Sequence, residues 1–315
     1  MKYITLTFSR KGNLIPNENQ NGIAGLRHVE HGFLIPLINI GYKTNRKVIL
    51  PPPWLCLLDK HNNNKKIDKT SNWNEYYDIG NNYKDDSVLT FNDNGSITTN
   101  KSVIYLSAIG IRNNTLDLTR FNQDLIVLTN ATVPNFPFYT EIPFNNTLNI
   151  VFKPSYLIKN CVRNILIRNN LVENSYTFIH LRRGDMLDNH SLIPPKGSRP
   201  FTNPHCIAYF LKNNTANLNI IISTNEKDVE YKKAIRKLLN DRNIFFEEEL
   251  FSNLPDYNNY IIYQICDELA NQSKINVVTH NLKLGKKIDY RLSDFSGFCS
   301  NENNIKQLAN LSGIF

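Results

Sequence analysis

The stretch Tyr176-Thr-Phe-Ile-His-Leu-Arg-Arg-Gly-Asp-Met186 carries the strongest structural signal in the chain. Its first part, Tyr176 to Leu181, is an apolar and β-branched run that predicts a buried β-strand. The run continues without a turn residue into Arg182 and Arg183, followed by a glycine and Asp185. In open α/β sheets, ligands bind just beyond the carboxyl ends of the strands. The stretch therefore predicts a ligand site at the end of a buried strand.

The adjacent arginines at this strand end indicate an anionic ligand. A guanidinium presents its N–H donors in a planar fork that matches two phosphate oxygens, and Gly184 allows close backbone approach. The alternative is that Asp185 pairs with one arginine while the other is a solvated loop charge, since surface ion pairs are common without function. Because His180 and Asp185 flank the pair at a strand end, we favour the ligand site.

The second half of the chain alternates strands with helices, which is typical of a doubly wound parallel sheet. After the expected helix at 155–170 and the strand above, the elements that we expect are a helix at 203–212, a strand at 218–223, a helix at 228–239, a strand at 243–246, a helix at 257–271 and a strand at 275–279.

The first half begins with a pattern typical of a βαβ unit, which makes parallel sheets. A strand at 4–8 is followed by a polar loop, a helix at 29–42 interrupted by Pro36, and a strand at 47–50. Further strands are expected at 102–106, 124–128 and 148–152.

A polar segment at 60–94 lacks clear periodicity and holds Trp73, Tyr76 and Tyr77. It is either a solvated loop that its aromatic residues anchor to the body or a part of an acceptor groove.

Length and charge narrow the possibilities further. A chain of 315 residues is long for one core, so we expect two domains. The net charge of +8 comes from scattered basic residues, which argues against a nucleic-acid groove. Five widely spaced cysteines are typical of reduced, mostly buried thiols, and no apolar segment is long enough for a signal or a membrane anchor. We therefore expect a cytoplasmic or soluble protein without a membrane span.

Three blocks of the sequence together resemble one enzyme superfamily. The block His180-Leu-Arg182-Arg183-Gly-Asp185 resembles the H-x-R-R-x-D motif of the superfamily that includes the α1,6- and α1,2-fucosyltransferases and the protein O-fucosyltransferases. The block 22–54 is similar to its N-terminal signature: a Gly-rich loop, a His-Gly step at His31-Gly32, and "NR-x-V-x-L-P-P". The turn Thr224-Asn225-Glu226 is similar to the superfamily's "A-T-D-D/E" turn.

The resemblance implies an α/β, GT-B-like fold with two Rossmann-like domains facing a central cleft, for which we take residues 1–150 and 151–315. It implies a glycosyltransferase that moves fucose from the nucleotide sugar GDP-fucose, its donor substrate, to a glycan or protein acceptor. The resemblance implies no metal and no separate cofactor. The N-terminal domain would be the acceptor side and the C-terminal domain would bind the donor.

The resemblance also assigns roles to individual residues. Arg182 would hold the β-phosphate as the main catalytic group, His180 would orient the nucleotide, and Arg183 and Asp185 would shape the site. Thr279 lies near the expected place of the superfamily's serine-rich phosphate loop, which is not recognisable in this chain. In the N-terminal loop, the residues expected to contact substrate are Gly22, Gly25 and Arg27, and the candidates for the general base are Glu30, His28 and Asp188.

The base of the donor depends on the turn after the strand at 218–223. A carboxylate only accepts hydrogen bonds, which suits the two adjacent donors of guanine, whereas an amide offers one donor and one acceptor. Asn225 occupies the position of the superfamily's first acidic residue. Three alternatives stay open: Glu226 reads guanine, Asn225 reads a base such as uracil, or Asn225 caps the helix that begins near Asp228.

Two other functions remain as alternatives to fucosyl transfer. The chain could transfer another deoxysugar, for example from UDP-rhamnose. It could also be a non-catalytic module of the same fold that binds a nucleotide or a carbohydrate, which the missing serine loop favours.

Overall fold

The computed structural model describes residues 1–7, 25–79, 83–108, 117–129, 152–183, 200–279, 284–285 and 287–295. The chain divides into two compact units. Unit 1 comprises Met1–Ile158 and Tyr257–Ile262, and unit 2 comprises Lys159–Asp256 and Tyr263–Phe315. The boundary that we expected near Ile150 lies outside the described residues.

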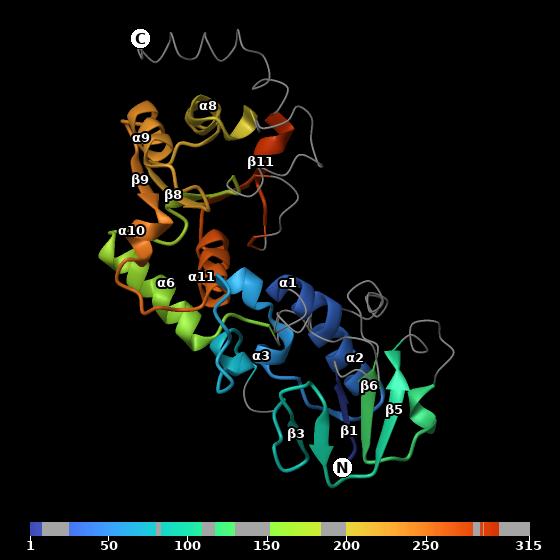
Figure 1. The fold of residues 1–315 in the computed structure, drawn as a ribbon. Helices are drawn as coiled ribbons and strands as arrows, with labels where there is room; N and C mark the ends of the chain where they lie inside the picture. Colours follow the sequence, from blue (N-terminus) through green and yellow to red (C-terminus); the bar gives the residue numbers. More distant parts are fainter. Residues whose placement is uncertain are drawn as a thin grey trace. The chain divides into compact units, whose positions relative to one another are not determined.

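Unit 2 contains a five-stranded, all-parallel sheet (Figure 1). Its strands are β7 (Tyr176–Leu181), β8 (Asn219–Thr224), β9 (Asn243–Phe246), β10 (Ile275–Val278) and β11 (Tyr290–Arg291). Their spatial order is β11-β10-β7-β8-β9, so the chain builds outward from β7 in one direction and then returns to add β10 on the other side. This order places a topological switch point between β7 and β10, where open α/β sheets bind ligands.

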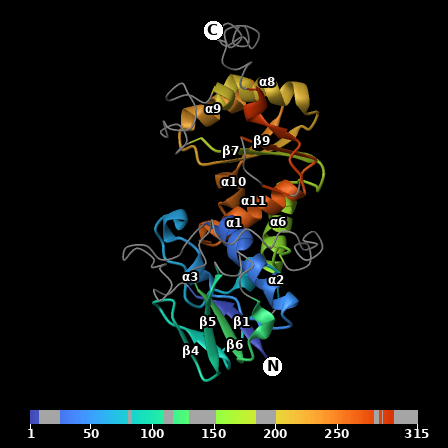
Figure 2. The same cartoon turned by 90° about the vertical axis from the view of Figure 1, so that its right-hand side faces the viewer.

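Helices cover both faces of this sheet. α8 (Pro204–Asn214) and α9 (Val229–Leu238) lie on one face, while α6 (Tyr156–Arg168) and α11 (Asn259–Asn271) lie on the other (Figures 1 and 2). A short helix, α10 (Glu247–Phe251), follows β9 directly. The core beneath α8 and α9 includes Ile179, Leu181, Ile222 and Ile235, all fully buried. The described part of the unit also contains two 3₁₀ turns, η8 (Pro200–Thr202) and η9 (Leu292–Phe295).

Unit 1 contains a four-stranded parallel sheet of order β2-β1-β6-β5. The strands are β1 (Tyr3–Leu6), β2 (Lys47–Val48), β5 (Val103–Ser107) and β6 (Leu125–Thr129). Its described residues also form an antiparallel pair, β3 (Leu89–Phe91) and β4 (Ile97–Thr99), and a short helix, α3 (Pro53–Cys56). They include three 3₁₀ turns, η3 (Asp59–Asn62), η4 (Trp73–Glu75) and η5 (Leu118–Arg120). The expected βαβ unit is present, because β1 and β2 pair in parallel.

The helix between β1 and β2 is continuous, and the expected interruption at Pro36 was wrong. α1 (Leu26–Val29) leads through a π-helical turn, η2 (Glu30–Leu34), into α2 (Ile35–Lys43), which carries Pro36 in its first turn. The π-helical turn ends directly before Pro36, where the N–H of Ile35 donates to the carbonyl oxygen of Glu30, and this change of hydrogen-bond register lets the helix continue past a residue that has no N–H. Within α2, Gly41 permits close packing on β2: a Cβ there would lie 2.1 Å from a methyl carbon of Val48.

The aromatic residues of the segment at 60–94 anchor it to unit 1. Trp73, Tyr76 and Tyr77 are almost completely buried, and the indole nitrogen Nε1 of Trp73 donates to the carbonyl oxygen of Pro51 at 2.7 Å. Of the two interpretations, a loop anchored by its aromatic side chains therefore describes this segment, although part of it also lines the pocket described below.

Arg46 ties β2 to the segment that leads into β6. It is 6% exposed, and its guanidinium donates to the carbonyl oxygens of Gln123 at 2.9 Å, Phe121 at 2.5 Å and Tyr3 at 3.4 Å. The arginine of the "NR-x-V" signature thus has a structural role in this chain.

We predict that Arg46→Lys lowers the stability of unit 1 by about 2 kcal/mol, because lysine cannot donate to diverging carbonyl oxygens with a planar fork. Both tryptophans of the chain, Trp54 and Trp73, belong to unit 1, so urea denaturation followed by tryptophan emission isolates that unit. Arg120→Lys, at an exposed arginine paired with Asp117, is the matched control and should change little. Equal midpoints for the two variants would contradict the role of Arg46.

Candidate functional site

Three strand ends meet at the carboxyl edge of the sheet in unit 2. In the register of the sheet, His180 of β7 pairs with Val278 of β10 on one side and with Ser223 of β8 on the other. The residues that follow these positions, Arg182 and Thr279 among them, therefore share one edge at the switch point. The sequence predicted that these segments contribute to one site, and the sheet brings them together.

The hydroxyl of Thr279 joins β10 to β7 across the switch point. Its Oγ1 donates to the carbonyl oxygen of His180 at 2.7 Å and accepts from the backbone N–H of Arg182 at 2.8 Å. Thr279 is fully buried, whereas Arg182 and His180 are half-buried. Both hydrogen bonds fix the backbone on either side of Leu181, so the direction in which the chain leaves β7 is set by this one side chain.

Asn225 makes the corresponding contact on the other side of β7. Its Oδ1 accepts from the backbone N–H of Arg183 at 2.8 Å. It does not cap α9: the N-cap is Asp228, whose Oδ1 accepts from the N–H of Glu230 at 2.9 Å. Of the three alternatives for Asn225, the helix cap was therefore wrong. The N–H groups of both arginines are held by side-chain oxygens from the two neighbouring strands.

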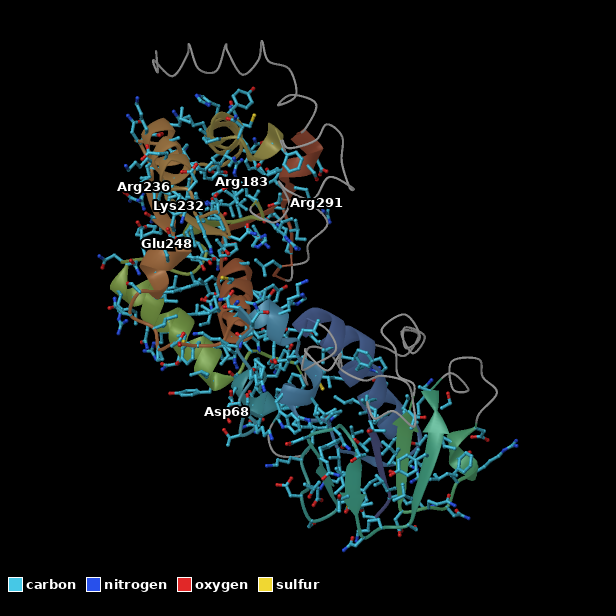
Figure 3. All side chains as sticks on the ribbon, in the orientation of Figure 1. Asp68, Arg183, Lys232, Arg236, Glu248 and Arg291 are labelled. Atoms are coloured by element: carbon cyan, nitrogen blue, oxygen red, sulfur yellow. The ribbon has the colours of Figure 1, made fainter. Side chains whose placement is uncertain are left out.

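The guanidinium of Arg183 is engaged within unit 2. Its Nε donates to Oε2 of Glu226 at 2.7 Å, and its Nη1 contacts the backbone and hydroxyl oxygens of Thr202 at 3.3 and 3.2 Å. The same group stacks over the ring of Tyr231 with its central carbon 4.3 Å from the centroid. Figure 3 shows Arg183 with the helices α8 and α9 of this unit. Glu226 is thus the ion-pair partner of Arg183, and the expectation that Arg183 shapes a substrate site stays a prediction.

The carboxylate of Glu226 stays ionised because its surroundings favour the charge. Burial opposes ionisation, but hydrogen bonds from the N–H groups of Asp228 and Lys227 and the ion pair with Arg183 outweigh it, so the pKa of Glu226 lies below its ordinary value. Both carboxylate oxygens thus already accept hydrogen bonds from the protein.

A second carboxyl group, Glu247, lies at the same end of β8, and its surroundings favour the protonated form. Its Oε2 accepts from the hydroxyl of Ser223 at 2.5 Å, and the thiol of Cys266 lies 3.9 Å away. Burial raises the pKa of Glu247 above its ordinary value, against the lowering effect of the Ser223 hydroxyl. Burial also raises the pKa of the Cys266 thiol, which is inert as a nucleophile in this state.

The candidate residues of the N-terminal block belong to unit 1. Glu30 lies in the π-helical turn, is 3% exposed, and accepts a hydrogen bond from the Tyr77 hydroxyl at 2.9 Å. Gly25 has a packing role, since a Cβ there would lie 2.9 Å from Nδ1 of His61. Arg27 and His28 are in α1, but their side chains lie outside the described part of the structure, as do Gly22, Asp185 and Asp188 altogether.

Other expectations concern metals, membranes and cysteines. Among the described residues, no group of three or more His, Cys, Asp or Glu side chains could hold a metal ion. No helix in the described ranges is long and apolar enough to cross a membrane. Cys56, Cys161, Cys206 and Cys266 are buried.

Comparison with known proteins gives matches in structure and none in sequence. No protein-family model matches the chain, and no curated protein matches it. The crystal structure of POFUT1 in complex with GDP-fucose aligns over 88% of this chain and 90% of that chain, with a TM-score of 0.50 and 10% identity. A structure of a mutant of Arabidopsis thaliana FUT1 in complex with GDP covers 95% of this chain and 68% of that chain, with a TM-score of 0.43 and 10% identity.

At such identity the likeness to POFUT1 concerns the fold. The expected α/β class is confirmed: the chain is mixed α/β with parallel sheets, and its fold is similar to that of POFUT1.

Sequence reasoning missed the residues that hold the predicted ones. Thr202 and Tyr231 surround Arg183, and Tyr77 holds Glu30. Glu247, which was not among the predicted residues, is held by Ser223. Ser223 stands at the end of a predicted strand, next to the turn that was singled out, and this position was the one available signal. Tyr77 was predicted only as an aromatic residue of the segment at 60–94, and nothing in the local pattern marks Thr202 or Tyr231.

We predict that Thr279→Val costs about 1–3 kcal/mol of stability, because it leaves the buried N–H of Arg182 without its acceptor. Thr279→Ser keeps the hydroxyl and should retain most of the stability. Thermal unfolding monitored by circular dichroism compares the two. If valine and serine are equally tolerated, the hydroxyl does not hold this edge.

We also predict opposite pH dependences for two isosteric changes on this edge. A carboxyl with a lowered pKa contributes stability above its unfolded pKa and loses it as the pH falls through its folded pKa. Glu226→Gln should therefore be less stable than the wild type at neutral pH, and the difference should shrink in acid.

A carboxyl with a raised pKa contributes stability below its unfolded pKa and loses it as the pH rises through its folded pKa. Glu247→Gln, which mimics the protonated form, should therefore gain stability over the wild type as the pH rises above the ordinary glutamate value of 4.5. Urea titrations from acid to mildly alkaline pH measure both differences. Curves of the same slope for the two variants would contradict the assignment.

Proposed function

We propose that the chain is an inverting, metal-independent glycosyltransferase that moves L-fucose from GDP-fucose to a hydroxyl of a glycan or a protein. The observation that carries this proposal is the Arg182-Arg183 pair at the switch point of the sheet in unit 2. The side chains of Thr279 and Asn225 hold the backbone N–H groups of this pair. It stands in a chain whose fold resembles that of POFUT1, a protein whose structure is in complex with GDP-fucose. The arrangement proposed for the whole chain is GT-B.

In this proposal, the guanidinium of Arg182 binds the β-phosphate of the donor. As the sugar leaves, negative charge grows on the nucleoside diphosphate, and a fixed cation aimed at it stabilises the transition state more than the ground state. The bonds of Thr279 to the backbone of β7 supply the fixed position. A guanidinium can provide this stabilisation without a divalent metal.

Arg183 has a supporting role in the proposal. Successive residues of an extended chain point to opposite sides, and Arg183 points to the side of Thr202 and Tyr231. Its ion pair with Glu226 joins the turn after β8 to the end of β7. His180 and Asp185 keep their expected roles in orienting the nucleotide and shaping the site.

The reading of the donor base is proposed for Glu226, next to Asn225. A carboxylate has about four lone-pair positions. Three of those on Glu226 already accept from Arg183, Lys227 and Asp228, so about one position is left for a donor of guanine. Because the oxygen of Asn225 already accepts from Arg183, its side chain is less suited to read a base. The presence of an amide where the superfamily has an acid nevertheless favours a second candidate, a transferase for another deoxysugar nucleotide such as UDP-rhamnose.

Glu30 is proposed as the general base on the acceptor side, with residues 1–150 supplying acceptor contacts and residues 151–315 supplying the donor site. Support for Glu30 comes from the π-helical turn that holds it, since such turns are frequent at functional sites.

We predict that Arg182→Ala lowers the rate of GDP release from GDP-fucose a few hundred-fold or more, and that Arg182→Lys recovers little of it. Arg183→Ala should act mainly by lowering stability. Arg236→Ala, at a surface arginine paired with Glu249, is the matched control. A folded Arg182→Ala protein with nearly normal turnover would refute the role of Arg182, and a wild type that binds GDP without releasing it from GDP-fucose would favour the non-catalytic module.

We further predict that GDP binds more tightly than UDP, and that EDTA changes neither binding nor turnover. Calorimetric titration of both nucleotides into the wild type and Glu226→Gln measures the base preference, since an unpaired polar group in a site can cost several powers of ten. Tighter binding of UDP would favour the rhamnose donor. Activity that is lost in EDTA and restored by manganese would overturn metal independence, and NMR of the first-formed product would test inversion at the anomeric carbon.

A further inference from the structure

Unit 1 contains a pocket of about 540 Å³ that none of the roles above uses. It is lined by the residues that follow β2, from Ile49 to Trp54, by the segment 69–74, and by the residues around β3. It thus lies beyond the carboxyl end of a strand in a parallel sheet, where such sheets bind ligands. Its volume is within the range of about 300–1,000 Å³ that is typical of small-molecule sites.

Aromatic side chains form much of the apolar lining. Trp54, Tyr83 and Phe91 are half-buried, which leaves part of each side chain exposed to solvent. Trp73 is buried and held by its hydrogen bond to the carbonyl oxygen of Pro51, so it forms a fixed wall. Flat, partly exposed aromatic rings suit a ligand with a flat array of C–H groups.

Polar side chains stand among these rings, and the charged ones are paired. Asn72 and Asn74 are exposed on the lining and carry amide groups. The amide oxygen of Asn72 caps η4 by accepting from the N–H of Asn74 at 2.9 Å, while its amide nitrogen carries two donors. Lys84 pairs with Asp86 and the lining residue Asp85 pairs with Lys47, each at 3.0 Å. Lys69 lies over the ring of Trp54 at 5.7 Å and pairs with Asp93 at 2.6 Å. With its charges balanced in this way, the pocket matches a neutral, hydroxyl-rich ligand better than an anion.

We propose that this pocket binds a neutral saccharide of one or two hexose rings. The C–H face of a pyranose would lie on Trp54, Tyr83 or Phe91, and the hydroxyl groups would bond to the amides and paired charges of the lining. An exposed ion pair such as Lys69–Asp93 contributes little, so a sugar could displace Lys69 from the ring of Trp54. The proposal concerns binding in unit 1 alone and does not depend on transfer from GDP-fucose.

The chain provides its own probe for this test. It contains two tryptophans, Trp54 and Trp73, and both line the pocket. Titration of the full chain with lactose, N,N′-diacetylchitobiose and methyl α-mannoside should give a saturable change in tryptophan emission with at least one sugar, at millimolar concentration. Saturation-transfer NMR on the same samples should show contact with the ring protons of that sugar.

Variants separate a binding site from a nonspecific effect. Trp54→Ala and Asn72→Ala should weaken binding of that sugar at least tenfold by NMR, and Trp54→Phe, which keeps a ring, should retain more of it. Tyr105→Ala, at an exposed aromatic residue of β5 that does not line the pocket, is the matched control. If Trp54→Ala does not fold, the comparison of Trp54→Phe with Asn72→Ala decides.

Several outcomes would overturn the proposal. These are no saturable signal with any of the three sugars, full binding by Trp54→Ala, or binding of a serine-containing peptide in place of the sugars. GDP affinity, which the proposed function places in unit 2, should be unchanged in every one of these variants. If the wild type does not bind GDP, the donor site is refuted and the saccharide proposal still stands.

Discussion

The hydroxyl of Thr279 is the contact on which the candidate site depends. It donates to one side of the Leu181 peptide and accepts from the other, and so joins the two strands between which the sheet reverses its order. The ladder between β7 and β10 ends at the pair His180–Val278, so the N–H group of Arg182 beyond it needs another partner. Asn225 supplies the partner for the N–H group of Arg183. The sheet edge that carries the candidate site is thus held by side chains and not by the sheet alone.

The contacts of Arg183 hold the segment from which Arg182 extends. The guanidinium of Arg183 contacts Glu226, Thr202 and Tyr231 within unit 2. Its charge is therefore balanced and its position is fixed. That arrangement stiffens the turn from which Arg182 extends. Glu226 and Glu247 show how position decides charge on one sheet edge, because hydrogen-bond donors favour the ionised form of Glu226 and burial opposes that of Glu247.

Much of the fold could be predicted because buried parallel strands have continuous apolar sequences. Tyr176–Leu181 and Asn243–Phe246 have the predicted bounds. β11, with two residues, is too short to show a pattern. The role of Asn225 could not be predicted, since its partner is 42 positions away in the sequence and Asp228 is an equally good local cap. Of the site, sequence identified the strand ends but not Thr202 or Tyr231, which act through tertiary contacts.

The π-helical turn before Pro36 amounts to one residue more than an α-helix would use over the same length. Each α-helical residue turns the chain by about 100°. The single extra residue therefore sets which side of α1 faces the body of unit 1, while α2 keeps its own packing through Gly41. A chain that gained or lost one residue here would turn the side chains of α1 by about 100° while α2 kept its packing on β2, so helix length itself would act as a selector of the surface that α1 presents.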